Sequence, residues 1–137
     1  MNIQIRYYSK TGHMKKMAQV IERLTGARAM TTDNPLTETA DVLFLGSAIY
    51  VAGIDNNVKK FIATLEKEKV KNVICFSSAA ILTSSYPQVK ALLEKQGIHV
   101  DEREFHCKGQ LSLMHRGHPD EEDLKNLETF IKGLNLI

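Results

Sequence analysis

Segments with the apolar pattern of strands alternate with segments with the pattern of helices along this chain of 137 residues. Apolar and polar side chains alternate from Asn2 to Tyr8, as in a β-strand with one buried face. The segment that follows carries apolar side chains at helical spacing, namely Met14, Met17, Ala18, Ile21 and Leu24. Such alternation is typical of an α/β fold, in which helices connect the strands of a parallel sheet.

The same reasoning predicts the rest of the elements. Gly26 is placed to end the first helix. We expect further strands at 28–31, 42–46, 73–76 and 98–106. We expect a brief helical segment before Asp41, a loop at 47–55, and longer helices beginning at Asp55, at Ser84–Pro87 and at His118–Asp123. The chain is therefore predicted to form a single domain, 1–137, with a doubly wound five-stranded parallel sheet and helices on both of its faces.

Composition narrows the classes of protein to which the chain can belong. Its 43% hydrophobic and 25% charged residues indicate a folded protein, and its net charge of +2 is too small to indicate nucleic-acid binding. No apolar run reaches the roughly 18–20 residues that span a bilayer, and residues 1–6 alternate like a strand rather than a secretory leader. We expect a cytoplasmic location, no nucleic-acid partner and no membrane span.

Cys75 and Cys107 lack the spacing of a metal site, so two buried thiols are expected.

A short turn from Ser9 to Met14 joins the first strand to the first helix. The first N–H groups of a helix have no intrahelical partner, and the helix dipole favours an anion beside them. The hydroxyls of Ser9 and Thr11 add donors, and Gly12 permits close approach of the backbone. These residues alone are compatible with a phosphate site and equally with an ordinary turn whose hydroxyls cap the helix.

Other phosphate-handling motifs are missing from the sequence. There is neither a GxxxxGK[ST] loop for nucleoside triphosphates nor a GxGxxG fingerprint for dinucleotides. Receiver domains need acidic residues where this chain has Tyr8-Ser9 and Gly46-Ser47. Small phosphatases need a cysteine nucleophile after the first strand, and the turn contains none.

The turn Ser9-Lys10-Thr11-Gly12-His13-Met14 resembles the phosphate loop of flavodoxins, [ST]-x-[ST]-G-x-[ST]. The segment from Gly46 to Gly53 resembles their loop G-[ST]-x-[IV]-Y-x-x-G, which lines the isoalloxazine ring. Segments 105–111 and 117–124 resemble parts of small bacterial flavodoxin-like proteins, so the resemblance covers nearly the whole chain. It implies the strand order 2-1-3-4-5 and a ligand crevice at the carboxyl ends of the first and third strands.

The resemblance also implies flavin mononucleotide (FMN) as the cofactor, with no catalytic residue and no metal ligand. Met14 departs from the family pattern, which has a hydroxyl there, and the segment after the fourth strand has no aromatic residue before Tyr86. The implied cofactor-binding residues are Ser9, Lys10, Thr11, Gly12, His13 and Met14 at the phosphate, Ala48, Ile49, Tyr50, Val51, Ala52 and Gly53 on one side of the ring, and Ser78, Ala79 and Ala80 on the other.

The function implied is electron transfer by bound FMN, with a redox partner protein or a small quinone-like acceptor as partner. Two alternatives stay open: a small FMN-dependent oxidoreductase of the quinone or protoporphyrinogen type, and a flavodoxin-like binding module that has lost FMN. An electron carrier is favoured over an enzyme. Gly53 is expected to let its peptide group reorient beside flavin N5. Lysines near the crevice are expected to stabilise reduced flavin, namely Lys10, Lys15, Lys16, Lys59 and Lys60.

Overall fold

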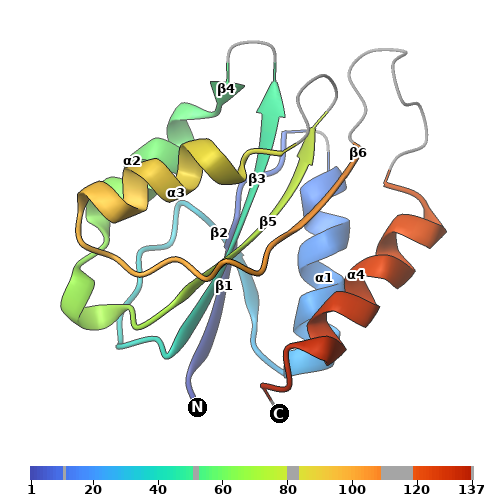
Figure 1. Cartoon of the computed structure of the whole chain (residues 1–137), viewed down its shortest axis with the longest axis horizontal. Coiled ribbons are helices and arrows are strands. Elements are labelled where there is room, and N and C mark those ends of the chain that lie inside the picture. The colour runs from blue at the N-terminus through green and yellow to red at the C-terminus, as the bar shows by residue number, and fades with distance from the viewer. Residues whose placement is uncertain (11, 51–52, 80–83, 109–118, 137) are drawn as a thin grey trace.

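The structure is a computed structural model that describes residues 1–10, 12–50, 53–79, 84–108 and 119–136. Strands and helices alternate along the chain, as the sequence predicts (Figure 1). The elements are β1 (Ile3–Tyr7), α1 (His13–Thr25), β2 (Ala29–Thr31), β3 (Val42–Tyr50), β4 (Gly53–Ile54), α2 (Asn56–Thr64), the 3₁₀ helix η1 (Lys67–Lys69), β5 (Val73–Ala79), α3 (Tyr86–Lys95), β6 (Phe105–Lys108) and α4 (Glu121–Gly133).

Five of the strands form a parallel sheet in the order β2-β1-β3-β5-β6. Once the two-residue β4 is set aside, this is the order 2-1-3-4-5 along the chain, so the predicted topology is confirmed. The registers of the central strands are continuous: Ile5 of β1 pairs with Phe44 of β3, and Phe44 pairs with Ile74 of β5. All five parallel strands therefore end at one edge of the sheet.

Helices cover both faces of the sheet, as predicted. Helices α1 and α4 pack on one face over a core that includes Phe44 and Phe76. Helices α2 and α3 pack on the other face over Leu43, Leu45 and Cys75. The alternation of side chains along the strands divides the apolar residues between these two cores. In Figure 1 the α1–α4 layer and the α2–α3 layer lie on opposite sides of the strands.

The brief helix expected before Asp41 is not formed, and that prediction is wrong: residues 32–41 cross from β2 to β3 as turns and extended chain. Polar side chains of β1 and of Asn2, which precedes it, bind the backbone of this segment. Arg6 Nε donates a hydrogen bond to the Asn34 carbonyl (2.7 Å), and Asn2 Nδ2 donates one to the Thr39 carbonyl (2.9 Å). A helix would have used those carbonyl groups in its own hydrogen bonds, so these contacts hold the segment in a non-helical path.

The carboxyl end of β3 also differs from expectation, because residues 47–50 extend the strand instead of opening the expected loop 47–55. The parallel pairing of β3 with β5 continues to Ile49 and Ala79, so β5 too is longer than the expected 73–76. Beyond it, β4 pairs antiparallel with β3, Tyr50 opposite Gly53. Ser47 and Ala48 are small and buried, and this lets the strand run on beneath the helices.

The last strand is shorter than the expected 98–106, since β6 begins at Phe105 and only Val100 forms an isolated bridge before it. The Asp101 carboxylate explains the interruption because it accepts a hydrogen bond from the Arg103 backbone N–H (2.8 Å) and turns the chain.

Cys75 is buried as expected, whereas Cys107 on this edge strand is only half-buried. None of the helices in the described parts of the chain is both long and apolar enough to span a bilayer.

Candidate functional site

The amino end of α1 differs from the amino ends of α2 and α4. Its N-cap is Gly12, in the left-handed region at φ 89°, with no side-chain cap and no acidic residue in the first turn. In contrast, Asp55 caps α2 by accepting a hydrogen bond from the Asn57 N–H (2.8 Å), and Asp120 and Asp123 form a capping box at α4. Within the described residues, the first N–H groups of α1 thus have no side-chain acceptor, as at an anion site.

Ser9 provides a second observation in the same turn. Its Oγ atom is buried, and it has no hydrogen-bond partner among the residues that the structure describes. A buried hydroxyl without a partner costs roughly 1–3 kcal/mol, so such groups are rare, and a bound ligand, water or ion can complete their bonding. Thr32 Oγ1 and Asn72 Oδ1 are in the same state among the described residues. Gly12, which was expected to permit close approach of the backbone in this turn, has a positive φ of 89°.

The turn lies at the point where the sheet topology changes direction. Strand β1 has β2 on one side and β3 on the other, and the Tyr8 N–H donates to the Gly46 carbonyl (3.3 Å) just beyond the end of β1. The chain leaves β1 for α1 on one face and leaves β3 for α2 on the other face. Crevices at such points are the usual ligand sites of open α/β sheets.

Positive charge collects near the turn. Lys10, Lys15 and Lys16 are exposed on the turn and in the first helical turn of α1. Burial lowers the pKa of His13 below its ordinary value, and the positive charge of Lys16 lowers it further. Lysines beside the amino end of a helix oppose the helix dipole, so an anion bound there would relieve an unfavourable arrangement.

Met14 fixes the end of the turn in the core. Its side chain is 2% exposed, and its Sδ accepts a hydrogen bond from the Ser78 Oγ of β5 (3.4 Å). The hydroxyl of Ser78, expected at the flavin, therefore contacts the start of α1. Two of the three segments expected to bind the cofactor are thus in contact here.

The structure places the remaining expected site residues as follows. Ala48 and Ala79 are both buried, Ala48 in the α1–α4 core and Ala79 in the α2–α3 core. Gly53 lies in the β4 hairpin at φ 101°. Ile49 and Tyr50 belong to β3 by their backbone. The residues that lie outside the described part of the chain are Thr11, Val51, Ala52 and Ala80.

Two pairs of hydroxyl groups near this edge were not singled out from the sequence. Ser47 Oγ of β3 lies 2.7 Å from Ser85 Oγ, and Ser77 Oγ of β5 lies 3.2 Å from Ser84 Oγ. These hydrogen bonds fasten the start of α3 to the ends of two central strands, next to the segments assigned to the flavin ring. The only signal in the sequence is a serine directly after each apolar strand core, at positions 47 and 77.

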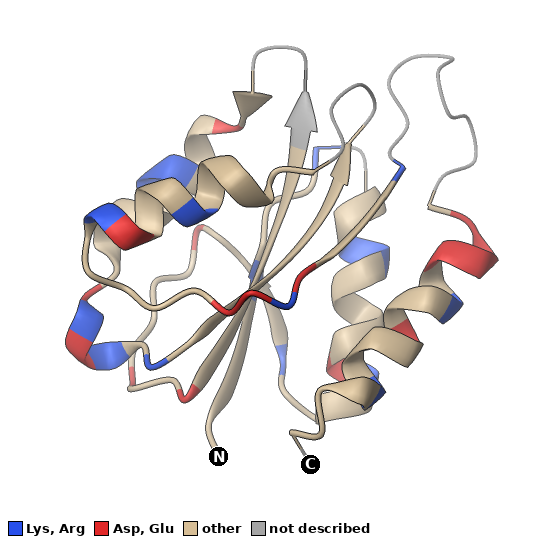
Figure 2. Ribbon diagram, viewed as in Figure 1, with Lys and Arg blue, Asp and Glu red and all other residues tan. Residues whose placement is uncertain are grey.

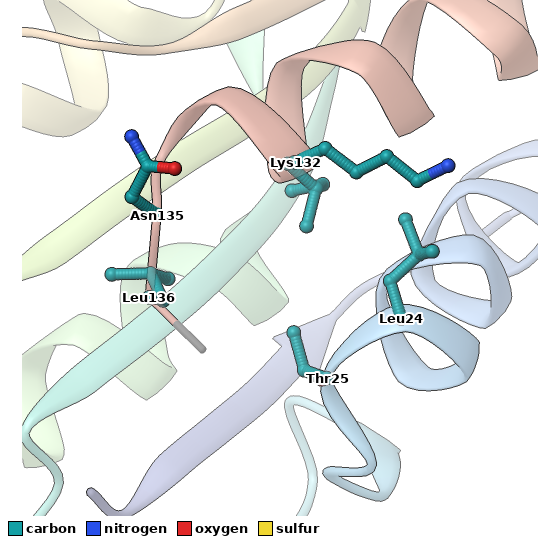
Figure 3. A pocket seen from close by; sticks show the side chains of 6 residues that line it. Leu24, Thr25, Lys132, Asn135 and Leu136 are labelled. Atoms are coloured by element: carbon teal, nitrogen blue, oxygen red, sulfur yellow. The ribbon is translucent and has the colours of Figure 1, made fainter.

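A hollow of about 230 Å³ lies elsewhere, between the carboxyl ends of α1 and α4 (Figure 3). Leu24 and Thr25 line it from α1, while Lys132 and Leu136 line it from the end of the chain. It is at the opposite end of α1 from Ser9, and the ammonium group of Lys132 already pairs with Glu128 (2.9 Å). The hollow therefore has no part in the anion site.

In the described residues no three His, Cys, Asp or Glu side chains are grouped to hold a metal ion.

No family model matches the chain, and no curated protein matches it by sequence. Solved structures do match its fold. An archaeal flavodoxin superposes with a TM-score of 0.72 at 15% identity, over 98% of this chain and 96% of that chain. The two-electron-reduced flavodoxin of Megasphaera elsdenii gives 0.63 at 21% identity, over 95% and 98%. The Flv1 flavodiiron core of Synechocystis gives 0.68 at 15% identity, over 98% of this chain but only 36% of that longer one. The chain therefore has the flavodoxin-like fold.

Proposed function

We propose that this protein binds FMN at the Ser9–Met14 turn and acts as an electron carrier. The observation that carries the proposal is the buried, unpartnered Ser9 Oγ beside the uncapped amino end of α1. These groups are donors without acceptors, which is the complement of a phosphate monoester. The solved structures of the same fold include flavodoxins, in agreement with the proposal.

The residues present fit the phosphate end of FMN. The Ser9 hydroxyl and the backbone N–H groups after Gly12 would hold the phosphate, while Lys15 and Lys16 supply positive charge near it. The side chain of Met14 has no hydrogen-bond donor, so the backbone must provide the contact that a hydroxyl makes in the flavodoxin pattern. The bound flavin would supply the redox chemistry.

Two segments would hold the flavin ring. They are residues 48–53 and residues 78–80. Among the described residues of these segments, Ala48 pairs with Ser78 and Ile49 pairs with Ala79 at the ends of β3 and β5. The protein's part is to hold the ring at this edge of the sheet and to exclude water from one side of it. The partner would be a redox protein or a small quinone-like acceptor.

The test compares FMN with riboflavin, which lacks the phosphate, by the quenching of flavin fluorescence. We expect FMN to bind at least about tenfold more tightly, since two or more charge-assisted hydrogen bonds are at stake. Ser9→Ala should weaken FMN binding by about tenfold and leave riboflavin binding unchanged. The exposed hydroxyl of Thr37 provides the control, Thr37→Ala, which should change neither.

Stability separates this role of Ser9 from a structural one. Without ligand, Ser9→Ala should leave the free energy of unfolding unchanged or raise it, because it removes a buried donor that has no partner. Equal affinity for FMN and riboflavin would refute the phosphate site. Reduction in two resolved one-electron steps supports the carrier, whereas rapid direct turnover with a quinone would assign the oxidoreductase alternative.

A further inference from the structure

Five exposed lysines lie on elements that adjoin the candidate flavin site (Figure 2). Two of them are in the first turn of α1, two are in the middle of α2, and one is the last residue of β6. We call these residues the lysine rim: Lys15, Lys16, Lys59, Lys60 and Lys108. They come from three elements far apart in the sequence, so the fold assembles the rim.

None of the rim lysines forms an ion pair with another described residue. Lysines at the other end of the molecule do pair: Lys71 with Asp41 (3.1 Å), and Lys132 with Glu128 (2.9 Å). The first turns of α1 and α2 also contain no acidic residue. The charge of the rim is thus not balanced by close contacts, although the net charge of the whole chain is only +2.

Acidic groups near the same edge are few and mostly engaged. Asp55 accepts hydrogen bonds from the backbone and side-chain nitrogens of Asn57, both at 2.8 Å. Glu104 pairs with His106 (2.8 Å). Two acidic groups remain: Asp33, exposed just beyond the carboxyl end of β2, and the first turn of α4, with Glu121 and Glu122 exposed. The edge therefore carries positive charge at the start of α1, on α2 and at the end of β6, and negative charge at Asp33 and at the start of α4.

We infer that the lysine rim is a docking surface for a redox protein that presents acidic side chains. The inference rests on the proposed FMN site, because docking at this end brings the partner to the flavin. Opposite charges steer diffusing proteins into contact and raise association rates by factors of about 10–10³ at low salt.

The test uses the FMN-loaded protein, reduced with dithionite, and two electron acceptors that differ only in surface charge. These are ferric cytochrome c with its native lysines, and the same cytochrome with its lysines succinylated. One electron passes from the reduced flavin to the haem iron, which becomes ferrous, and stopped-flow absorbance follows the change. We expect the succinylated cytochrome to react about tenfold faster at low ionic strength. Added salt should slow that reaction and speed the one with native cytochrome.

A matched pair of variants locates the effect. Lys59→Glu/Lys60→Glu changes the rim without touching the Ser9–Met14 turn. Lys67→Glu/Lys95→Glu makes the same change in net charge on η1 and at the end of α3. The two variants are compared in about 0.1 M salt, where exposed charges farther apart than about 10 Å are largely screened. There the rim variant should lose the preference for the succinylated cytochrome, and the control should retain most of it.

Three outcomes would overturn the inference: faster reaction with native cytochrome, no dependence on salt, or equal losses in the two variants. Each of these requires a protein that has bound FMN and shows its visible absorption. Failure to bind FMN would instead refute the proposed function, so the two failures are distinct.

Discussion

The ring of Phe76 in β5 lies directly over the backbone of Gly46 in β3. A Cβ atom at position 46 would be 2.3 Å from Phe76 Cζ and 2.5 Å from Cε2. Both residues belong to the face of the sheet that α1 and α4 cover, and Phe76 is 1% exposed. The contact lies two residues before Ala48 and Ser78, which are paired neighbours in the same two strands.

Gly46→Ala is therefore expected to lower the free energy of unfolding by about 2–4 kcal/mol, because a fully buried ring must move. Urea denaturation measures the loss. Gly133→Ala is the control: a Cβ there meets nothing within 4 Å, so stability should stay the same or rise slightly. In a Phe76→Leu background the loss caused by Gly46→Ala should be smaller, and an equal loss would contradict the contact.

Gly12 and Gly26 offer a matched pair at the two ends of α1. Both have positive φ, 89° and 76°, and a Cβ at either would meet nothing within 4 Å. Alanine at either position should cost about 1–2 kcal/mol of stability through backbone strain alone. Only Gly12→Ala should also weaken FMN binding, as measured by fluorescence titration. The same loss of affinity in Gly26→Ala would show that the effect is general destabilisation.

Gly53→Ala tests whether the peptide at the β4 hairpin changes with the flavin's redox state. Alanine resists a φ of 101°, and its Cβ would lie 3.1 Å from Gln88 Oε1. We expect the one-electron potentials to shift by about 59 mV, the equivalent of a tenfold change in relative affinity for two redox states. Gly97→Ala has a similar strain at φ 79° and should leave the potentials unchanged. Unchanged potentials in Gly53→Ala would refute the switching role.

Asp101 makes stability depend on pH in the acid range. Hydrogen bonds from the Arg103 side chain (2.8 and 3.0 Å), and then from Asn72 (2.9 Å), hold the pKa of this carboxyl well below its usual value. A carboxyl with a lowered pKa in the folded state stabilises the fold above its ordinary pKa, near 4. That stabilisation is lost as pH falls toward the folded-state pKa. Urea denaturation between pH 3 and 7 measures the effect. In Asp101→Asn the free energy of unfolding should decrease less on acidification than in the unmodified protein, whereas in Glu38→Gln, at an exposed position, it should decrease by the same amount.

The local signals in the sequence were enough for much of the fold. Asp55 caps α2, and Gly26 ends α1 at positive φ, because caps depend on neighbouring residues only. The parallel order followed from alternating elements together with the resemblance to flavodoxins. The missing helix before Asp41 had a signal as well, since Asn2 and Arg6 place polar side chains on the face that a helix would have covered.

Other features depend on contacts that only the folded chain creates. The Ser78–Met14 hydrogen bond joins residues 64 positions apart, and the Ser47–Ser85 pair joins residues 38 apart. The extension of β3 to Tyr50 depends on its pairing with β5, which a single segment does not reveal. For the candidate site, the sequence singled out Ser9 and Gly12, whereas the burial of Ser9 Oγ without a partner needed the folded chain.

The two edges of the parallel sheet are formed by its shortest strands. β2 has three residues and β6 has four, against five to nine in the central strands. Short edge strands have few unpaired backbone N–H and C=O groups, so a strand of a second molecule can form few hydrogen bonds with them. Copies of this protein at high concentration therefore gain little from pairing their edge strands. Their interactions depend instead on the charges of their exposed side chains.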